Sequence, residues 1–309
     1  MRKLSFIFFL FSLLTLPQRL CFGALSAQLF FNDEEKNIMS AGEATNLKID
    51  IFNDESAEPL HHFHPMHEKP LHLLIISEDM ESFSHLHPIQ LSEHLGIFSI
   101  DLNQPTRDPY NLDSAKSVLR PGNYFVFAES MPMGFSMTTI PLNFIATGEA
   151  LPKKPLLLDP IEKDGFIYKI FDDYKVKLKV KTYAHCGTFS ASFDAEIQKY
   201  NQTTHSFVDV IDLEPWLSSF AHAVMLSENG LSANDKKFVH LHAVWPLVDD
   251  PESERGPYLK IASDSHVPMV EGNFKVWLQL QHQHQVKTFP FVIEIKAPTL
   301  TRNQLKVCL

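Results

Sequence analysis

The chain has 309 residues, a formal net charge of −10 and only three cysteines, while 44% of its residues are hydrophobic. This length fits one large domain or two ordinary ones, and the acidic balance argues against nucleic acid or an anionic membrane as a partner. The few cysteines exclude a disulfide-dense scaffold. Histidine is the unusual component, because its 16 residues occur in clusters and none lies before position 61.

The N-terminal segment predicts a secretory signal peptide. Arg2 and Lys3 precede an apolar run over residues 4–16, which Pro17 ends. Such a run is too short to cross a bilayer as a helix, which takes roughly 20 residues. We therefore expect residues 1–27 to be removed and the mature protein to be periplasmic or secreted, without a membrane span.

The first module is predicted over residues 28–149. Short runs rich in β-branched and aromatic residues alternate with Gly, Pro, Asn and Asp, which indicates β-strands joined by turns. We expect one helical turn near residues 113–118, in the longest connection. The predicted strands cover residues 47–52, 71–77, 83–87, 96–102, 123–128 and 138–146.

A linker and a second module follow. Residues 150–164 hold three prolines and no strand pattern, which is typical of a linker. The second module is predicted over residues 165–298 and a tail over residues 299–309. For Cys186 and Cys308, a disulfide and a free thiol both stay open. The predicted strands cover residues 166–171, 175–183, 188–198, 222–227, 237–245, 258–262, 274–280 and 288–295.

Two stretches of the chain repeat each other at an offset of 150 residues. The first hairpin, over residues 70–88, reads PLHLLIISEDMESFSHLHP and returns in longer form over residues 220–246. Residues 122–127 return as residues 272–277. Duplication of one unit is the simplest explanation, so we expect an all-β fold with two tandem immunoglobulin-like β-sandwich modules after the signal peptide.

The histidines of the first hairpin are expected to share one face. Side chains alternate across a strand, so His85 and His87 point to the same side. If Ser77 pairs with Ser82, His72 lies opposite His87, with Cβ atoms roughly 4.5 to 5.5 Å apart. That spacing suits imidazole nitrogens that reach one metal ion at about 2.0 to 2.1 Å.

The second hairpin repeats this arrangement if His222 faces His242. His67, five residues before His72, is the candidate for a fourth ligand, and it makes the first hairpin the better candidate site. Imidazole suits copper and zinc, and the methionines at residues 131–133 favour copper. The predicted cofactor is copper, with zinc or no cofactor as alternatives, and the predicted metal residues are His67, His72, His85, His87, His222, His240 and His242.

The first module also carries the runs HEKPLHL over residues 67–73, SED over 77–79, HLHP over 85–88 and PGNY over 121–124. In these motifs the chain resembles the YtkA-like/FixH-like extracytoplasmic β-sandwich proteins of bacteria, over most of residues 40–148 and 210–295. The resemblance implies a β-sandwich fold, a link with copper and heavy-metal handling, and the same seven histidines. This chain departs from the pattern at Ala243, where a proline is expected, and in its enlarged second turn.

The leading interpretation is an extracytoplasmic protein that binds a transition metal, copper before zinc, for delivery, buffering or detoxification. An unidentified protein would then be its partner in metal transfer. The alternative is a structural or interaction protein whose histidines brace the hairpins without metal. We do not expect an enzyme, because the chain has no Ser-His-Asp order and no glycine-rich phosphate loop. Metal binding needs neutral imidazoles, so it is expected to weaken as the pH falls through about 6.5.

Overall fold

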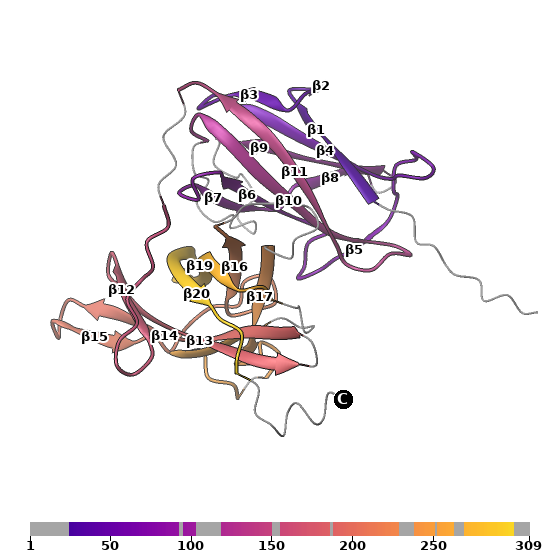
Figure 1. Cartoon of the computed structure of the whole chain (residues 1–309). Helices are drawn as coiled ribbons and strands as arrows, with labels where there is room; N and C mark the ends of the chain where they lie inside the picture. The colour runs from indigo at the N-terminus through magenta and orange to yellow at the C-terminus, as the bar shows by residue number, and fades with distance from the viewer. Residues whose placement is uncertain are drawn as a thin grey trace, which may run out of the picture.

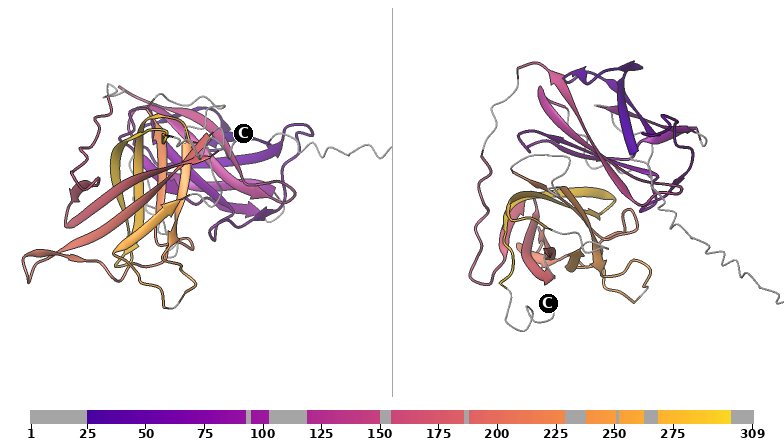
Figure 2. Two further views of the ribbon diagram at one scale, coloured as in Figure 1. Left: turned by 60° about the horizontal axis from the view of Figure 1, so that its bottom comes forward. Right: turned by 45° about the vertical axis from the view of Figure 1, so that its right-hand side comes forward.

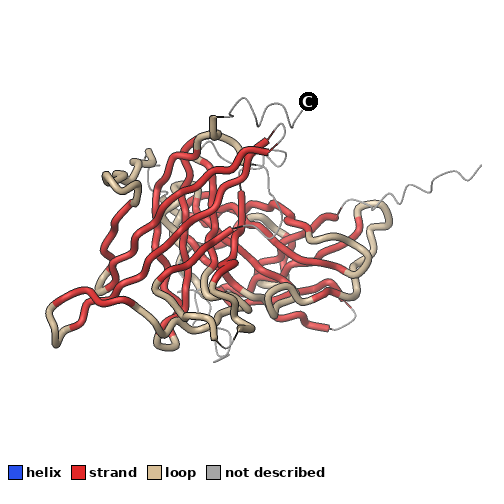
Figure 3. The backbone as a smooth tube through the Cα atoms, turned by 90° about the horizontal axis from the view of Figure 1, so that it is seen from below, coloured by secondary structure: helices blue, strands red, loops and turns tan. Residues whose placement is uncertain are grey.

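A computed structural model of the whole chain describes residues 25–92, 95–102, 119–149, 155–185, 188–228, 238–250, 252–262 and 269–299. Within these ranges the regular structure consists of β-strands without a helix, which confirms the predicted all-β class (Figure 3). In the same ranges no helix is long and apolar enough to cross a membrane. The expected helical turn near residues 113–118, both Cys186 and Cys308, and most of the predicted signal peptide lie outside the described residues.

The first module is a sandwich of two antiparallel-rich sheets (Figure 1). One sheet has the order β2-β1-β4-β9-β8, and the other has the order β3-β11-β10-β6-β7 with β5 paired to β10. The strands are β1 Leu25–Phe31, β2 Glu34–Glu35, β3 Ile38–Ser40, β4 Thr45–Asn53, β5 Phe63–His64, β6 Leu71–Ser77, β7 Phe83–Leu86, β8 Ile89–Ser92, β9 Leu95–Leu102, β10 Gly122–Pro132 and β11 Thr138–Thr147.

The second module is one continuous, curled sheet of nine strands, drawn from salmon pink through orange to yellow in Figure 2. Its order is β12-β13-β14-β18-β17-β16-β19-β20, with β15 paired to β14. The strands are β12 Ile167–Phe171, β13 Tyr174–His185, β14 Thr188–Asn201, β15 Ser206–Asp209, β16 His222–Ser227, β17 Phe238–Trp245, β18 Tyr258–Ala262, β19 Gly272–His282 and β20 Gln285–Ile295.

The two modules have the same strand order, and one residue accounts for their main difference. In the first module Pro88 stands between β7 and β8, and proline has no N–H to continue a ladder. In the second module Ala243 takes this place, and its N–H donates to the Ala221 carbonyl at 2.8 Å. Strand β17 therefore runs unbroken and pairs with both β16 and β18, so two sheets become one.

The hairpin strands are buried on both faces, because each face packs against a different partner. In β6, the side chains of Leu71, Leu73 and Ile75 belong to the core of the first module. Leu74 and Ile76, which alternate with them, lie instead in a cluster shared with the second module. This explains why residues 71–77 read as an apolar run rather than the alternating pattern of a half-exposed strand.

An apolar cluster joins the two modules. The rings of Phe83 and Trp277 stack with centroids 4.7 Å apart, and those of Phe127 and Phe238 stack at 3.9 Å. The cluster also holds Leu74, Ile76, Met80, Val224 and Leu226. It forms where β6 and β7 face β16, β17 and β19, as Figure 1 and the right-hand view of Figure 2 show.

The interface is close to two-fold symmetric. Phe127 and Trp277 are equivalent residues of the repeat, and each stacks on the phenylalanine that opens the other module's histidine strand. Ser218 donates its N–H and its hydroxyl to Glu68, at 3.0 and 2.9 Å. These two residues also occupy equivalent positions of the repeat. The same patch of both modules is therefore used, as in the isologous interface of a homodimer.

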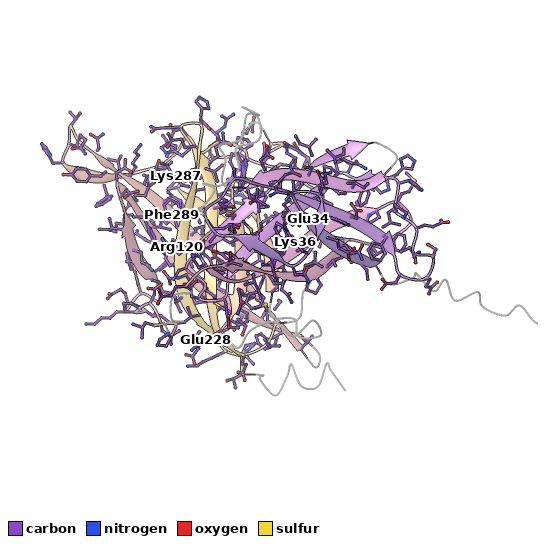
Figure 4. All side chains as sticks on the ribbon, turned by 90° about the horizontal axis from the view of Figure 1, so that it is seen from above. Glu34, Lys36, Arg120, Glu228, Lys287 and Phe289 are labelled. Atoms are coloured by element: carbon purple, nitrogen blue, oxygen red, sulfur yellow. The ribbon has the colours of Figure 1, made fainter. Side chains whose placement is uncertain are left out.

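Four labelled side chains help to locate the two modules in the view from above. Glu34 and Lys36 lie on the first module, whereas Lys287 and Phe289 lie on the second (Figure 4).

Strand β1 begins at Leu25, just before the predicted cleavage after Ala27. The boundary of the signal peptide stays a prediction.

Candidate metal centre

Six of the seven predicted histidines form two triads. In each triad one ring nitrogen of every histidine lies within 4.8 Å of those of the other two. The expected registers are confirmed, since His222 pairs with His242 and Ser77 donates to the Ser82 carbonyl at 3.0 Å. The first triad consists of His72, His85 and His87, and the second of His222, His240 and His242.

Hydrogen bonds define which nitrogens of the first triad carry lone pairs. His72 donates Nε2–H to the Met66 carbonyl at 2.8 Å, and His85 donates Nδ1–H to Gln279 Oε1 at 3.0 Å. In neutral rings, Nδ1 of His72 and Nε2 of His85 are then both acceptors, yet they lie 3.1 Å apart. Two lone pairs repel each other at this distance, and a cation between them would remove the repulsion.

The second triad has the same nitrogen pattern. His222 donates Nε2–H to the Trp216 carbonyl at 2.9 Å, and His240 donates Nδ1–H to Glu129 Oε2 at 2.7 Å. The opposite nitrogens, Nδ1 of His222 and Nε2 of His240, are buried without a hydrogen-bond partner. Buried polar atoms are rarely left unsatisfied, so these two atoms are candidates for metal ligands.

Each module orients a histidine of the other. Glu129 of β10 holds His240 of the second module, and Gln279 of β19 holds His85 of the first. The hydroxyl of Thr139 donates to Glu129 at 3.1 Å, and the Gln279 amide donates to Thr288 at 3.1 Å. This is the second layer of contacts that fixes ring orientation in metal sites.

Burial disfavours the protonated form of His72, His85 and His222. It lowers the pKa of His72 to about 3, with the nearby His240 adding to the shift. It also lowers the pKa of His85 and His222 well below the usual range, and neighbouring histidines contribute. Neutral rings offer lone pairs to a metal ion at pH 7. Protons are therefore expected to compete with a metal ion at a lower pH than the value of about 6.5 predicted from the pKa of free histidine.

His67 lies between the two triads, closer to the second than to the first, and its role as a fourth ligand stays a prediction. Its ring centroid lies 6.4 Å from that of His72, but it stacks on His242 of the second triad at 3.7 Å. The cause is the tight turn between Met66 and Lys69, in which His67 and Glu68 adopt left-handed φ values of 44° and 71°. The turn directs His67 across the interface.

Other candidate ligands lie apart from the triads. His282 is held by the Tyr174 hydroxyl at 2.6 Å and by Asp212 at 3.0 Å, which is the arrangement of a structural histidine. Met131 is the exception: it pairs with His64 between β10 and β5, two residues along β10 from Glu129, which pairs with His72. Among the described residues, groups of three or more His, Cys, Asp or Glu with metal-like spacing are confined to the two triads.

The sequence-based prediction missed three residues of the site, namely Glu129, Gln279 and Trp216. The Trp216 ring lies 4.9 Å from that of His222 and 5.4 Å from that of His85. Glu129 and Gln279 were detectable, because they are polar residues at the repeat offset in otherwise apolar strands. Their role became visible only when the two modules were placed face to face.

Fold and site together define a class: an all-β protein of two repeated sandwich-like modules with paired, buried histidine triads between them. The family model described as "Domain of unknown function (DUF8832)" matches residues 31–146 and 168–297, so the chain belongs to this family. The two matched segments correspond to the two modules.

Comparison with the curated proteins gives no match. Among solved structures, the Enterococcus faecalis MSCRAMM ACE, described as binding its ligands by the collagen Hug Model, is similar at 8% identity with a TM-score of 0.14. The alignment covers 87% of this chain and 94% of that chain. A TM-score this low carries no argument about fold or ligand. The resemblance to YtkA-like and FixH-like proteins stays a prediction.

Proposed function

We propose that this protein binds transition-metal ions through its two histidine triads, copper before zinc, and serves in metal delivery, buffering or detoxification. The observation that carries the proposal is the pair of facing lone pairs on His72 and His85, 3.1 Å apart in a fully buried site. A hydrogen bond between these two atoms needs one ring to be protonated, because both rings already donate elsewhere, and burial disfavours that by lowering the pKa of both. A metal ion satisfies both.

The choice of copper rests on general ligand chemistry. Divalent copper binds a given nitrogen site more tightly than zinc does, and imidazole accepts either ion. Three imidazoles also leave a coordination position open, which suits an ion that is taken up and passed on. The extracytoplasmic setting follows from the predicted signal peptide and is part of the proposal.

A purely structural role is the second candidate, favoured by the hydrogen bonds His85–Gln279 and His240–Glu129 across the interface. These contacts brace the two modules without any ion. The two candidates differ in one measurable respect. A structural role predicts the same melting temperature with and without metal, whereas metal binding raises it by mass action.

The test is a titration of purified, chelator-treated protein with Cu²⁺ and Zn²⁺ in competition with a chelator of known affinity. We expect micromolar or tighter binding and a rise in melting temperature in the wild type. His85→Ala should lose binding at the first triad, and His240→Ala should lose binding at the second. His205→Asn is the matched control, because His205 is exposed in a turn with φ of 52°, which asparagine tolerates. No uptake of either metal by the wild type would contradict the proposal.

A further inference from the structure

The two triads lie almost as close to each other as their own members do. Within the triads, ring centroids lie between 4.7 and 5.5 Å apart. Across the interface, His85 lies 5.1 Å from His240 and 5.9 Å from His222, and His72 lies 6.0 Å from His240. The six rings therefore form one cluster rather than two separate sites.

The contacts that orient the rings also cross between the triads. Glu129 pairs with His72 in the register of β6 and β10, yet its carboxylate holds His240 of the second triad. Gln279 pairs with His222 in the register of β16 and β19, yet its amide holds His85 of the first. Neither triad has its full set of orienting contacts within one module, so the site is complete only when both modules are in place.

On this basis we propose that the triads form a single two-ion centre, in which two metal ions lie close enough to share a bridging ligand across the interface. The proposal rests on the proposed metal-binding function and adds the number of ions and their coupling. Each ion takes three imidazoles, and the open coordination position of each faces the other ion. Two-metal sites of this kind hold their ions about 3.5 to 4 Å apart.

The charge of the pair identifies the class of bridging ligand. Two divalent ions bring four positive charges into a buried site, where His85 and His222 have no exposed surface. Glu129, which holds His240 and is 5% exposed, supplies one negative charge at the edge. Desolvation makes the remaining charge costly, so a small anion such as hydroxide is expected between two cupric ions.

Electron paramagnetic resonance of the copper-loaded protein tests the pairing. Wild-type protein is loaded with Cu²⁺, freed of excess ion, and analysed for copper by elemental analysis and for unpaired spins by double integration. We expect two copper ions per chain and either a spin count well below the bound copper or a half-field signal from the coupled pair. Dilution of copper with excess Zn²⁺ in the same protein should restore one full spin per copper.

Four outcomes decide the matter. A coupled pair that zinc dilution uncouples supports the proposal. Two copper ions with a full spin count and no half-field signal overturn the pairing and leave the metal-binding function intact, and one copper per chain does the same. No bound copper or zinc overturns both. His242→Ala should keep one copper with full spin intensity, and the zinc-dilution experiment decides the question in wild type if this variant fails to fold.

Discussion

The two triads have the same ligands in the same geometry, but they are oriented by different groups. His240 of the second triad donates to the Glu129 carboxylate, whereas His85 of the first donates to the Gln279 amide oxygen. A carboxylate partner makes an imidazole more basic and a stronger metal ligand. The second triad is therefore expected to hold a divalent ion more tightly, which reverses the ranking that His67 and Pro88 suggested in the sequence.

The comparison teaches that a duplicated unit can keep its geometry while its halves diverge in electrostatics. His67 contributes to this divergence, because it stacks on His242 and its equivalent in the second module is Leu217. The interface is thus nearly symmetric, although its two triads have different surroundings. Substitutions that exchange the residues at equivalent positions measure how far the two triads differ in stability and metal affinity.

Replacement of His85 or His240, the second histidine of each triad in the sequence, by alanine should give the largest losses of stability. The two losses should also differ clearly from each other. In metal-free protein, His240→Ala leaves the buried Glu129 carboxylate with the Thr139 hydroxyl and without its ring partner, at a cost of about 3 to 5 kcal/mol. His85→Ala leaves a neutral amide instead and should cost about 1 to 3 kcal/mol. Urea unfolding in the presence of a chelator measures both values. Equal losses would refute the proposed difference.

The break at Pro88 between β7 and β8, where the second module has the continuous strand β17, offers the next comparison. Ala243→Pro removes the N–H that donates to Ala221 and lies 3.1 Å from the Ser219 hydroxyl, and should destabilise the protein by about 1 to 3 kcal/mol. The reverse change, Pro88→Ala, removes no donor and should cost less. Thermal unfolding of the two variants gives the ranking. A smaller loss for Ala243→Pro would show that the continuous strand is not needed.

Exchange of the orienting groups should shift metal affinity between the triads. Glu129→Gln should weaken binding at the second triad about 10- to 100-fold, and Gln279→Glu should strengthen binding at the first. Competition titrations with a Cu²⁺ chelator follow both sites. The double exchange is the control, because it keeps the composition of the site and should invert the order of the two affinities. An unchanged order would show that these groups do not set it.

Acid should weaken the metal-free protein through histidines of both triads. The pKa of His72 lies at about 3 in the folded protein and near 6.5 in the unfolded chain, so the unfolded state binds more protons between these values. Stability therefore falls as the pH drops below 6.5, by about 1.4 kcal/mol per pH unit for each such histidine, and is constant above it. Chemical unfolding between pH 5 and 7.5 with a chelator present checks this, and a flat profile would contradict it.

Much of the fold was readable from the sequence because the repeat and the strand patterns are local. The predicted strands at residues 71–77, 222–227 and 258–262 match β6, β16 and β18 to the residue. The strands that were missed are short or lie near sheet edges, where pairing rather than side-chain pattern creates them. They are β1, β2, β3, β5, β8 and β15.

The sequence by itself determined which histidines share a face, because side-chain alternation and hairpin register need only the two strands concerned. It did not determine what that face meets. Only the packing of Phe83 on Trp277 and of Phe127 on Phe238 placed the triads opposite each other. The tertiary structure decided the rest, since burial, neutral imidazoles and the cross-module contacts of Glu129 and Gln279 all arise from that interface.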